Sequence, residues 1–138
     1  MVGLHAAALD NRIKGVASIS GFMPFRGDIG GEGGRGGVER WSKLYQLQPR
    51  LGFFIGSEEK IPYDYDDVLG EIVGRGGEVL VYAPLRDRVN SATDVEECVK
   101  SVVDEDNNIE LVMLDDINSL NDAVHESVNG WLARKTQH

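Results

Sequence analysis

The feature that most constrains the fold is the alternation of short apolar runs with helical patterns along the chain. The clearest run, residues 78–83 (EVLVYA), is almost continuously apolar and is followed by Pro84. Such a run suits a strand that is covered on both faces, as in a parallel sheet. Residues 16–20 and 109–114 are two further strand candidates, and helical patterns separate the three. Strands that alternate with helices imply parallel crossovers, so the sequence predicts an α/β fold with a partial parallel sheet flanked by helices.

Helical periodicity accounts for most of the remaining chain. Thr93, with Glu96 three residues later, has the pattern of a capping box that opens a helix. The predicted helices are 2–9, 38–47, 65–73, the segment opened by Thr93, and a last segment that starts at Ser119 and carries an apolar stripe from Leu120 to Leu132. Residues 22–62 form a glycine-rich excursion, since 27–40 (GDIGGEGGRGGVER) alone holds seven of the 17 glycines. Three strands are few for such a sheet, so we expect one edge to need a partner.

Length and charge restrict the classes of partner. The chain has 138 residues, 41% of them hydrophobic, which favours one folded domain spanning residues 1–138. A net charge of −9 repels phosphate backbones and anionic headgroups, so nucleic acid and membrane surfaces are poor partners. The sequence has neither a run near the roughly 20 apolar residues of a membrane span nor a signal-peptide pattern at its start. The single cysteine, Cys98, is expected to be buried; a reducing compartment fits it, and a cytoplasmic location is the default interpretation.

Several motifs resemble ligand sites without meeting their requirements. GEGGRG (residues 31–36) matches a dinucleotide fingerprint, but that motif must follow a strand directly and open a helix, and a flexible excursion is the simpler interpretation. The acidic clusters at 64–67 and 104–106 are expected to be solvated turns, with Asp66 and Asp67 near a helix N-terminus. His5, His125 and His138 have no metal-ligand spacing. We therefore expect no metal and no cofactor.

The segment APLRDR (residues 83–88) has a different position in the fold. It leaves the carboxyl end of the best strand, where α/β sheets place ligands and catalytic groups. Asp87 could orient a histidine as a triad acid, or it could form a loop ion pair with Arg86 or Arg88; the residues alone leave both open. The other half of such a site would be the loop after the next strand, residues 115–118 (DDIN).

This order of elements resembles the C-terminal half of the α/β-hydrolase superfamily, specifically its dienelactone-hydrolase and acyl-esterase-like members. In that family a strand ends in G-x-S-x-G, and a helix like VGLHAAALDNRIKGV follows it at once. The resemblance then matches VASISGF to the next strand, the glycine-rich excursion to a cover over the active site, and EVLVYAPLRDR to the acid-bearing strand. IELVMLDDINSLNDAVHESVNGWL completes the pattern. The resemblance implies that the chain is equivalent to the part of the fold that follows the nucleophile elbow.

The resemblance carries over to this sequence one residue at a time. Asp87 matches the position of the triad acid. The histidine position falls near Asn118, and an asparagine cannot act as a general base at neutral pH. The nucleophile has no match, because the serines of this chain lack an elbow signature. The chain is therefore expected to be a hydrolase-derived fragment that does not hydrolyse esters or acyl groups unaided.

Two other interpretations remain open. The chain could be a non-catalytic binding or interaction module assembled as a homodimer; as a hydrolase-derived fragment, it is expected to form a homodimer or to pair with a complementary N-terminal half. In a binding module, aromatic residues including Phe22 and Trp41 would line a pocket for a small acyl or ester ligand, or a protein-binding surface, although such residues are more often core. A working hydrolase with unusual chemistry, such as an acid plus a metal, is the third possibility.

Overall fold

Three parallel strands form the centre of the protein in a computed structural model that describes residues 2–26, 38–43, 49–103 and 108–135. The strands are β1 (Gly15–Ile19), β2 (Glu78–Tyr82) and β3 (Ile109–Val112), and they lie in the order β1-β2-β3. Gly15 is paired with Glu78 and Val79 with Ile109. The predicted fold class, a partial parallel sheet flanked by helices, is confirmed, and each strand lies within one or two residues of its predicted range.

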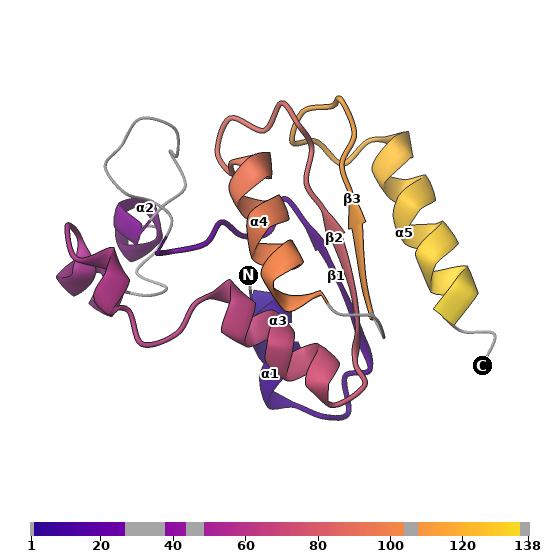
Figure 1. Ribbon diagram of the computed structural model, residues 1–138. Helices are drawn as coiled ribbons and strands as arrows, with labels where there is room; N and C mark the ends of the chain where they lie inside the picture. Colours follow the sequence, from indigo (N-terminus) through magenta and orange to yellow (C-terminus); the bar gives the residue numbers. More distant parts are fainter. Residues whose placement is uncertain (1, 27–37, 44–48, 104–107, 136–138) are drawn as a thin grey trace.

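The helices are unequally divided between the two faces of the sheet (Figure 1). The first face carries α1 (Val2–Leu9), α3 (Tyr65–Gly74) and α4 (Ala92–Val102), whereas α5 (Asp122–Lys135) covers the second. A short helix, α2 (Val38–Lys43), and two 3-10 turns, η1 (Pro49–Phe54) and η2 (Glu58–Lys60), lie to one side of the sheet. The predicted helix over 38–47 is thus described as far as Lys43, and 44–48 lie outside the described residues.

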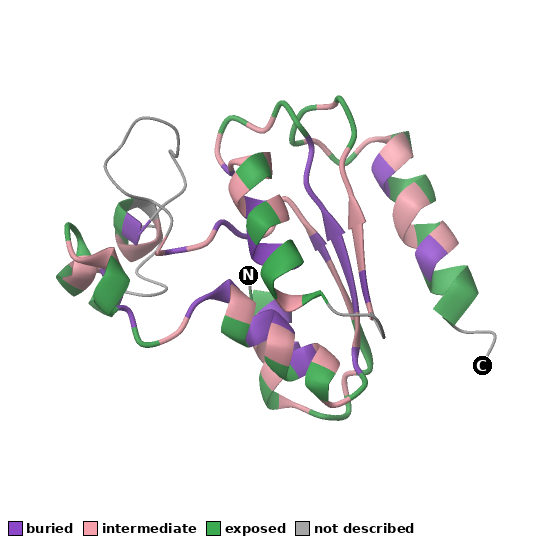
Figure 2. Ribbon diagram, viewed as in Figure 1, coloured by how far each residue is buried: buried purple, intermediate pink, exposed green. Residues whose placement is uncertain are grey.

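The alternation of side chains along β2 explains why this strand has so few polar residues. Val79 and Val81 belong to the large apolar cluster on the face of α1, α3 and α4. Leu80 and Tyr82 are also buried and point to the opposite face, which α5 covers, because successive strand residues point to opposite sides. The strand is half-buried at Glu78 and buried from Val79 to Tyr82, and Figure 2 shows most of β2 in the colour of buried residues, as the apolar run EVLVYA predicted for a strand covered on both faces.

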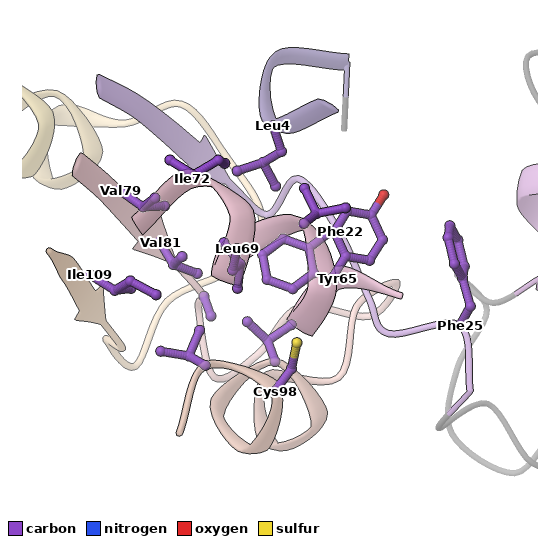
Figure 3. Close-up of a cluster of buried hydrophobic side chains, with 14 of the residues drawn as sticks. Leu4, Phe22, Phe25, Tyr65, Leu69, Ile72, Val79, Val81, Cys98 and Ile109 are labelled. Carbon is purple, nitrogen blue, oxygen red and sulfur yellow. The ribbon is translucent and has the colours of Figure 1, made fainter. Parts of the chain in front are cut away.

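Aromatic and aliphatic side chains from distant parts of the sequence meet in the core of the first face (Figure 3). Phe22 stacks on Tyr65 with ring centroids 4.5 Å apart, and both side chains are buried. Leu4 of α1, Leu69 and Ile72 of α3 and Cys98 of α4 belong to the same cluster. Burial of Cys98 agrees with the expectation from sequence.

The start of α3 corrects the prediction that residues 64–67 form a solvated turn. Asp64 is only 4% exposed and is the N-cap of α3, and together with Asp67 it forms a capping box. Its carboxylate also accepts the backbone N–H groups of Phe25 and Arg26, both at 2.8 Å. A carboxylate with this many donors can be buried without losing its hydrogen bonds. Asp64 therefore ties the start of α3 to the chain that follows β1.

Two other helix starts differ from the predictions. The side chain of Ser91, not Thr93, caps α4 by accepting the N–H of Asp94 at 3.3 Å. The last helix begins at Asp122 instead of Ser119, because the side-chain oxygen of Asn121 accepts the N–H of Val124 at 3.1 Å. Leu120 consequently precedes the helix and is 72% exposed, so it is not part of the buried stripe.

Part of the glycine-rich excursion lies outside the described residues. The motif at 31–36, the acidic cluster at 104–106 and His138 lie outside the described residues. The described parts of the excursion are more regular than expected, since 49–54 and 58–60 form the two 3-10 turns. Phe22 and Phe25 at its start are fully buried, so this part of the excursion belongs to the core.

Candidate functional site at the carboxyl edge of the sheet

The loops that follow the three strands meet at one edge of the sheet, because parallel strands end on the same side (Figure 1). The loop after β2 contains Asp87, and the loop after β3 contains Asn118. Backbone hydrogen bonds join these two loops: Leu85 N–H donates to the carbonyl of Leu114, and Arg86 N–H donates to that of Asp116, both at 2.9 Å. The two loops that the sequence analysis assigned to one candidate site, APLRDR and DDIN, are thus neighbours in the structure.

Asp87 is held by its own loop. Its Oδ1 accepts the backbone N–H of Val89 at 2.8 Å and that of Asn90 at 3.2 Å. Its Oδ2 accepts the side-chain Nδ2 of Asn90 at 3.2 Å. The carboxylate is half-buried, and these donors fix its orientation. Its immediate partners are therefore amide groups of the turn it begins.

Arg86, one of the two arginines considered as an ion-pair partner of Asp87, pairs with Asp115 instead. Arg86 Nε lies 2.8 Å from Oδ1 of Asp115, and Arg86 Nη2 donates to the carbonyl of Asp115 at 2.8 Å. Both side chains are mostly exposed, so this pair contributes little to stability by itself. It adds a side-chain link between the loops after β2 and β3.

Asn118 lies on the loop after β3 and is exposed. The loop from Met113 to Asn121 contains no histidine in the sequence. Asp116, two residues before Asn118, is held by the side chain of Asn121 and by the N–H of Ile117 at 2.7 Å. The hydrogen bond from Asn121, followed by that from Ile117, holds the pKa of Asp116 below its usual value.

Ser20 and Asn90 are parts of this edge that sequence reasoning missed. Ser20 follows β1 directly, and its φ of 45° lies in the left-handed region. The Nδ2 of Asn90 donates to the carbonyl of Ser20 at 2.9 Å, across 70 residues of sequence. Asn90 is 5% exposed and also contacts Asp87, so one side chain connects the acid loop to the end of β1. The spacing Asp87-x-x-Asn90 is the one local signal that could have indicated this turn.

The aromatic residues proposed to bind a ligand are not gathered in one place. Phe22 is buried against Tyr65 and also lines a small cavity with Ser20, Asp87 and Asn90. Trp41 lies on α2, half-buried, and packs against the edge of the core cluster, and it is not among the residues that line that cavity. Two further aromatic residues of the excursion also differ in exposure, since Phe25 is buried and Phe53 is 86% exposed.

Neither a metal centre nor a reactive thiol is present among the described residues. No group of three or more His, Cys, Asp or Glu side chains in this part of the chain could hold a metal ion. His5 instead packs edge-on against Tyr63 and Tyr65. Burial, and then the nearby carboxylates of the α3 start, raise the pKa of Cys98 to about 12, so its thiol stays protonated near neutral pH. Within the described residues, no helix has the length and apolar character needed to cross a membrane.

A scan against protein-family models finds no match for this chain, and searches of curated proteins and of solved structures also find none. The relation to α/β-hydrolases therefore stays a prediction from the order of the elements in the sequence and from the position of Asp87.

Proposed function

We propose that this chain is the acid-bearing half of an α/β-hydrolase-like fold, whose full-length relatives hydrolyse esters or acyl groups, and that it does not catalyse this reaction unaided. The observation that carries the proposal is the position of Asp87. It follows the middle strand, its carboxylate is oriented by turn amides, and its loop is hydrogen-bonded to the loop after the next strand. A triad acid needs a fixed carboxylate beside the loop that carries the histidine, because the acid orients the imidazole and stabilises its charged form.

The arrangement of elements gives further support. The strands are parallel and lie in sequence order, so the carboxyl ends of β2 and β3 are neighbours. Asn118 stands on the second of the two loops, where the resemblance puts the catalytic base. An amide side chain cannot accept a proton at neutral pH, so the acid has no base to orient at this position. The chain is for this reason proposed to lack ester hydrolysis of its own.

The test is to restore the base. In Asn118→His, the Asp87 carboxylate should favour the imidazolium form and raise the imidazole pKa above the ordinary value of about 6.5. Titration of the imidazole carbon-bound protons by NMR measures this pKa. Combining the change with Asp87→Asn should return the pKa to its ordinary value. Ile117→His, one residue away and also exposed, is the matched control and should not depend on Asp87.

Two results would contradict this proposal. An imidazole pKa at position 118 that does not respond to Asp87→Asn would overturn the proposed acid–base relation. A second measurement tests the lack of activity: the unmodified chain should hydrolyse 4-nitrophenyl acetate no faster than buffer. A rate above that of buffer that disappears in Asp87→Ala would instead support a working hydrolase.

An interaction module is the second candidate, and the free edge of β1 favours it. In the described sheet β1 has β2 as its one neighbour. The carbonyl of Lys14 accepts from Glu78 N–H, and Ser20 N–H donates to Tyr82, so the even-numbered residues of β1 face β2. The backbone groups of Ala17 and Ile19 consequently point away from β2, as in any parallel edge strand. Such an edge can pair with a strand of another chain.

Assembly through this edge predicts a homodimer. Light scattering should give twice the mass of the 138-residue chain. Ala17→Pro removes an outward N–H without touching the ladder to β2, so it should shift the protein toward the monomer while the far-UV circular dichroism stays unchanged. A mainly monomeric unmodified chain, or a dimer that is unaffected by Ala17→Pro, would contradict pairing through β1.

A further inference from the structure

A small, partly open space lies between the end of β1 and the loop that holds Asp87. Its volume is about 10 Å³, and its lining includes Ser20, Phe22, Tyr82, Asp87 and Asn90. A space of this size holds about one water molecule and excludes larger ligands. The lining combines apolar walls with the polar side chains of three residues, so the space is not purely apolar.

The orientation of the Asn90 amide is fixed by its partners. Nδ2 has two acceptors, the carbonyl of Ser20 at 2.9 Å and Oδ2 of Asp87 at 3.2 Å. Exchanging the nitrogen and oxygen would bring an oxygen against both acceptors, so this assignment of the amide is the favourable one. The side-chain Oδ1 of Asn90 is fully buried and has no hydrogen-bond partner within the protein. Any group that satisfies this oxygen must be a donor.

Ser20 contributes a second buried polar atom of the same kind. Its Oγ is fully buried and has no hydrogen-bond partner within the protein. Its φ of 45° lies in the left-handed region, which glycine adopts without steric cost and other residues adopt only with strain. The backbone conformation at this position favours glycine, but the residue is a serine with a buried hydroxyl. Two residues that line one space thus each carry a buried polar atom without a partner in the protein, and a molecule in that space could satisfy both.

We propose that this space binds one water molecule, which donates a hydrogen bond to Oδ1 of Asn90 and shares a second with Oγ of Ser20. Buried waters commonly make about three hydrogen bonds, and the Asp87 carboxylate on the same lining is available as a further acceptor. The water links the end of β1 to the acid loop in parallel with the direct bond from Asn90 to Ser20. It is thereby a fixed part of the support of Asp87, whichever reaction or partner that residue serves.

A crystal structure at a resolution of about 1.5 Å or better tests the proposal on the unmodified chain, since ordered water is routinely visible there. The expected result is a single water peak within hydrogen-bond distance of Asn90 Oδ1 and Ser20 Oγ. Absence of such a peak, a direct bond between Ser20 Oγ and Asn90 Oδ1, or an ion with five or more oxygen ligands would each overturn the proposal.

A pair of serine variants tests the part assigned to Ser20. Ser20→Ala should remove or weaken the water peak. It should also speed hydrogen exchange of the backbone amide of Asn90 about fivefold, which corresponds to the roughly 1 kcal/mol of one hydrogen bond. Ser18→Ala is the matched control: Ser18 is also buried with an unpartnered hydroxyl, but it does not line this space. Equal effects of the two changes, or an unaltered water in Ser20→Ala, would overturn the assignment to Ser20.

Discussion

The two faces of the sheet are covered by different numbers of helices and buried side chains. The first face is covered by α1, α3 and α4, whose buried side chains form one continuous cluster with those of β2 and β3, and the half-buried Val16 of β1 packs against it. The second face is covered, among the described residues, by α5 alone, which buries Val124 and Trp131. At Gly15 this contact is so close that an added Cβ would lie 3.0 Å from the Trp131 ring. The comparison indicates that the first face carries most of the stability and that α5 is attached through few side chains.

The largest effect should come from opening the first face. Leu69 on α3 is fully buried in the cluster, so Leu69→Ala should lower the free energy of unfolding by about 2–5 kcal/mol through lost burial and a cavity. Denaturant unfolding followed by circular dichroism measures this change. Leu120→Ala is the matched control, because Leu120 is 72% exposed and its truncation should stay within about 0.5 kcal/mol. Similar losses in the two variants would break the comparison.

The second face should respond locally. Trp131→Ala removes the largest buried side chain of α5, and with it much of the apolar contact that holds this helix to the sheet. Because α5 has few other buried contacts, we expect amide hydrogen exchange to accelerate over residues 122–135 while α3 and α4 stay protected. Uniform acceleration across the whole protein would instead show that α5 unfolds only together with the first face.

Alkaline pH should destabilise the protein, in part through two buried groups of the first face. Burial raises the pKa of Cys98 from 9.0 to about 12, and burial also raises the pKa of Tyr65. The folded state then keeps protons that the unfolded state releases, so this stability is complete below pH 9 and is lost as the pH rises toward 12. Each such group adds a slope of about 1.4 kcal/mol per pH unit. Unfolding measured from pH 8 to 11 checks this, and Cys98→Ala should reduce the slope; an identical slope in the variant would contradict the role of the thiol.

Much of the fold could be predicted from the sequence because the strongest signals there are local. EVLVYA is apolar on both sides, and the structure shows why: Val79 and Val81 face the cluster while Leu80 and Tyr82 face α5. Helix starts were less accurate, since several residues near each start can act as caps. Ser91 and Asn121 supply the caps of α4 and α5, and choosing them over Thr93 and Ser119 depends on the path of the preceding loop.

The candidate site could be predicted only in part. Asp87 was found because its position after a buried strand is readable from the sequence. Ser20 and Asn90 were missed because the hydrogen bond that joins them spans 70 residues and exists only once β1 lies beside β2. Asp64 was misassigned for the same reason: two of its donors, Phe25 and Arg26, lie almost 40 residues away, so its burial could not be inferred from the acidic run.

The smallest expected effect concerns the ion pair that joins α5 to β3. Arg134 Nη2 lies 2.7 Å from both carboxylate oxygens of Glu110 on β3, but the two side chains are 57% and 41% exposed. Water and salt screen such a pair, so a double-mutant cycle with Arg134→Ala and Glu110→Ala should give a coupling of about 0.2–1 kcal/mol that shrinks in about 1 M salt. The Lys100–Glu96 pair on α4, at 2.7 Å, is the control on the first face and should give a similarly small value. A coupling well above 1 kcal/mol at Arg134 would mean that α5 is held to the sheet by charge as much as by Trp131. The two faces would then differ in the type of interaction that attaches their helices and not in the extent of apolar packing.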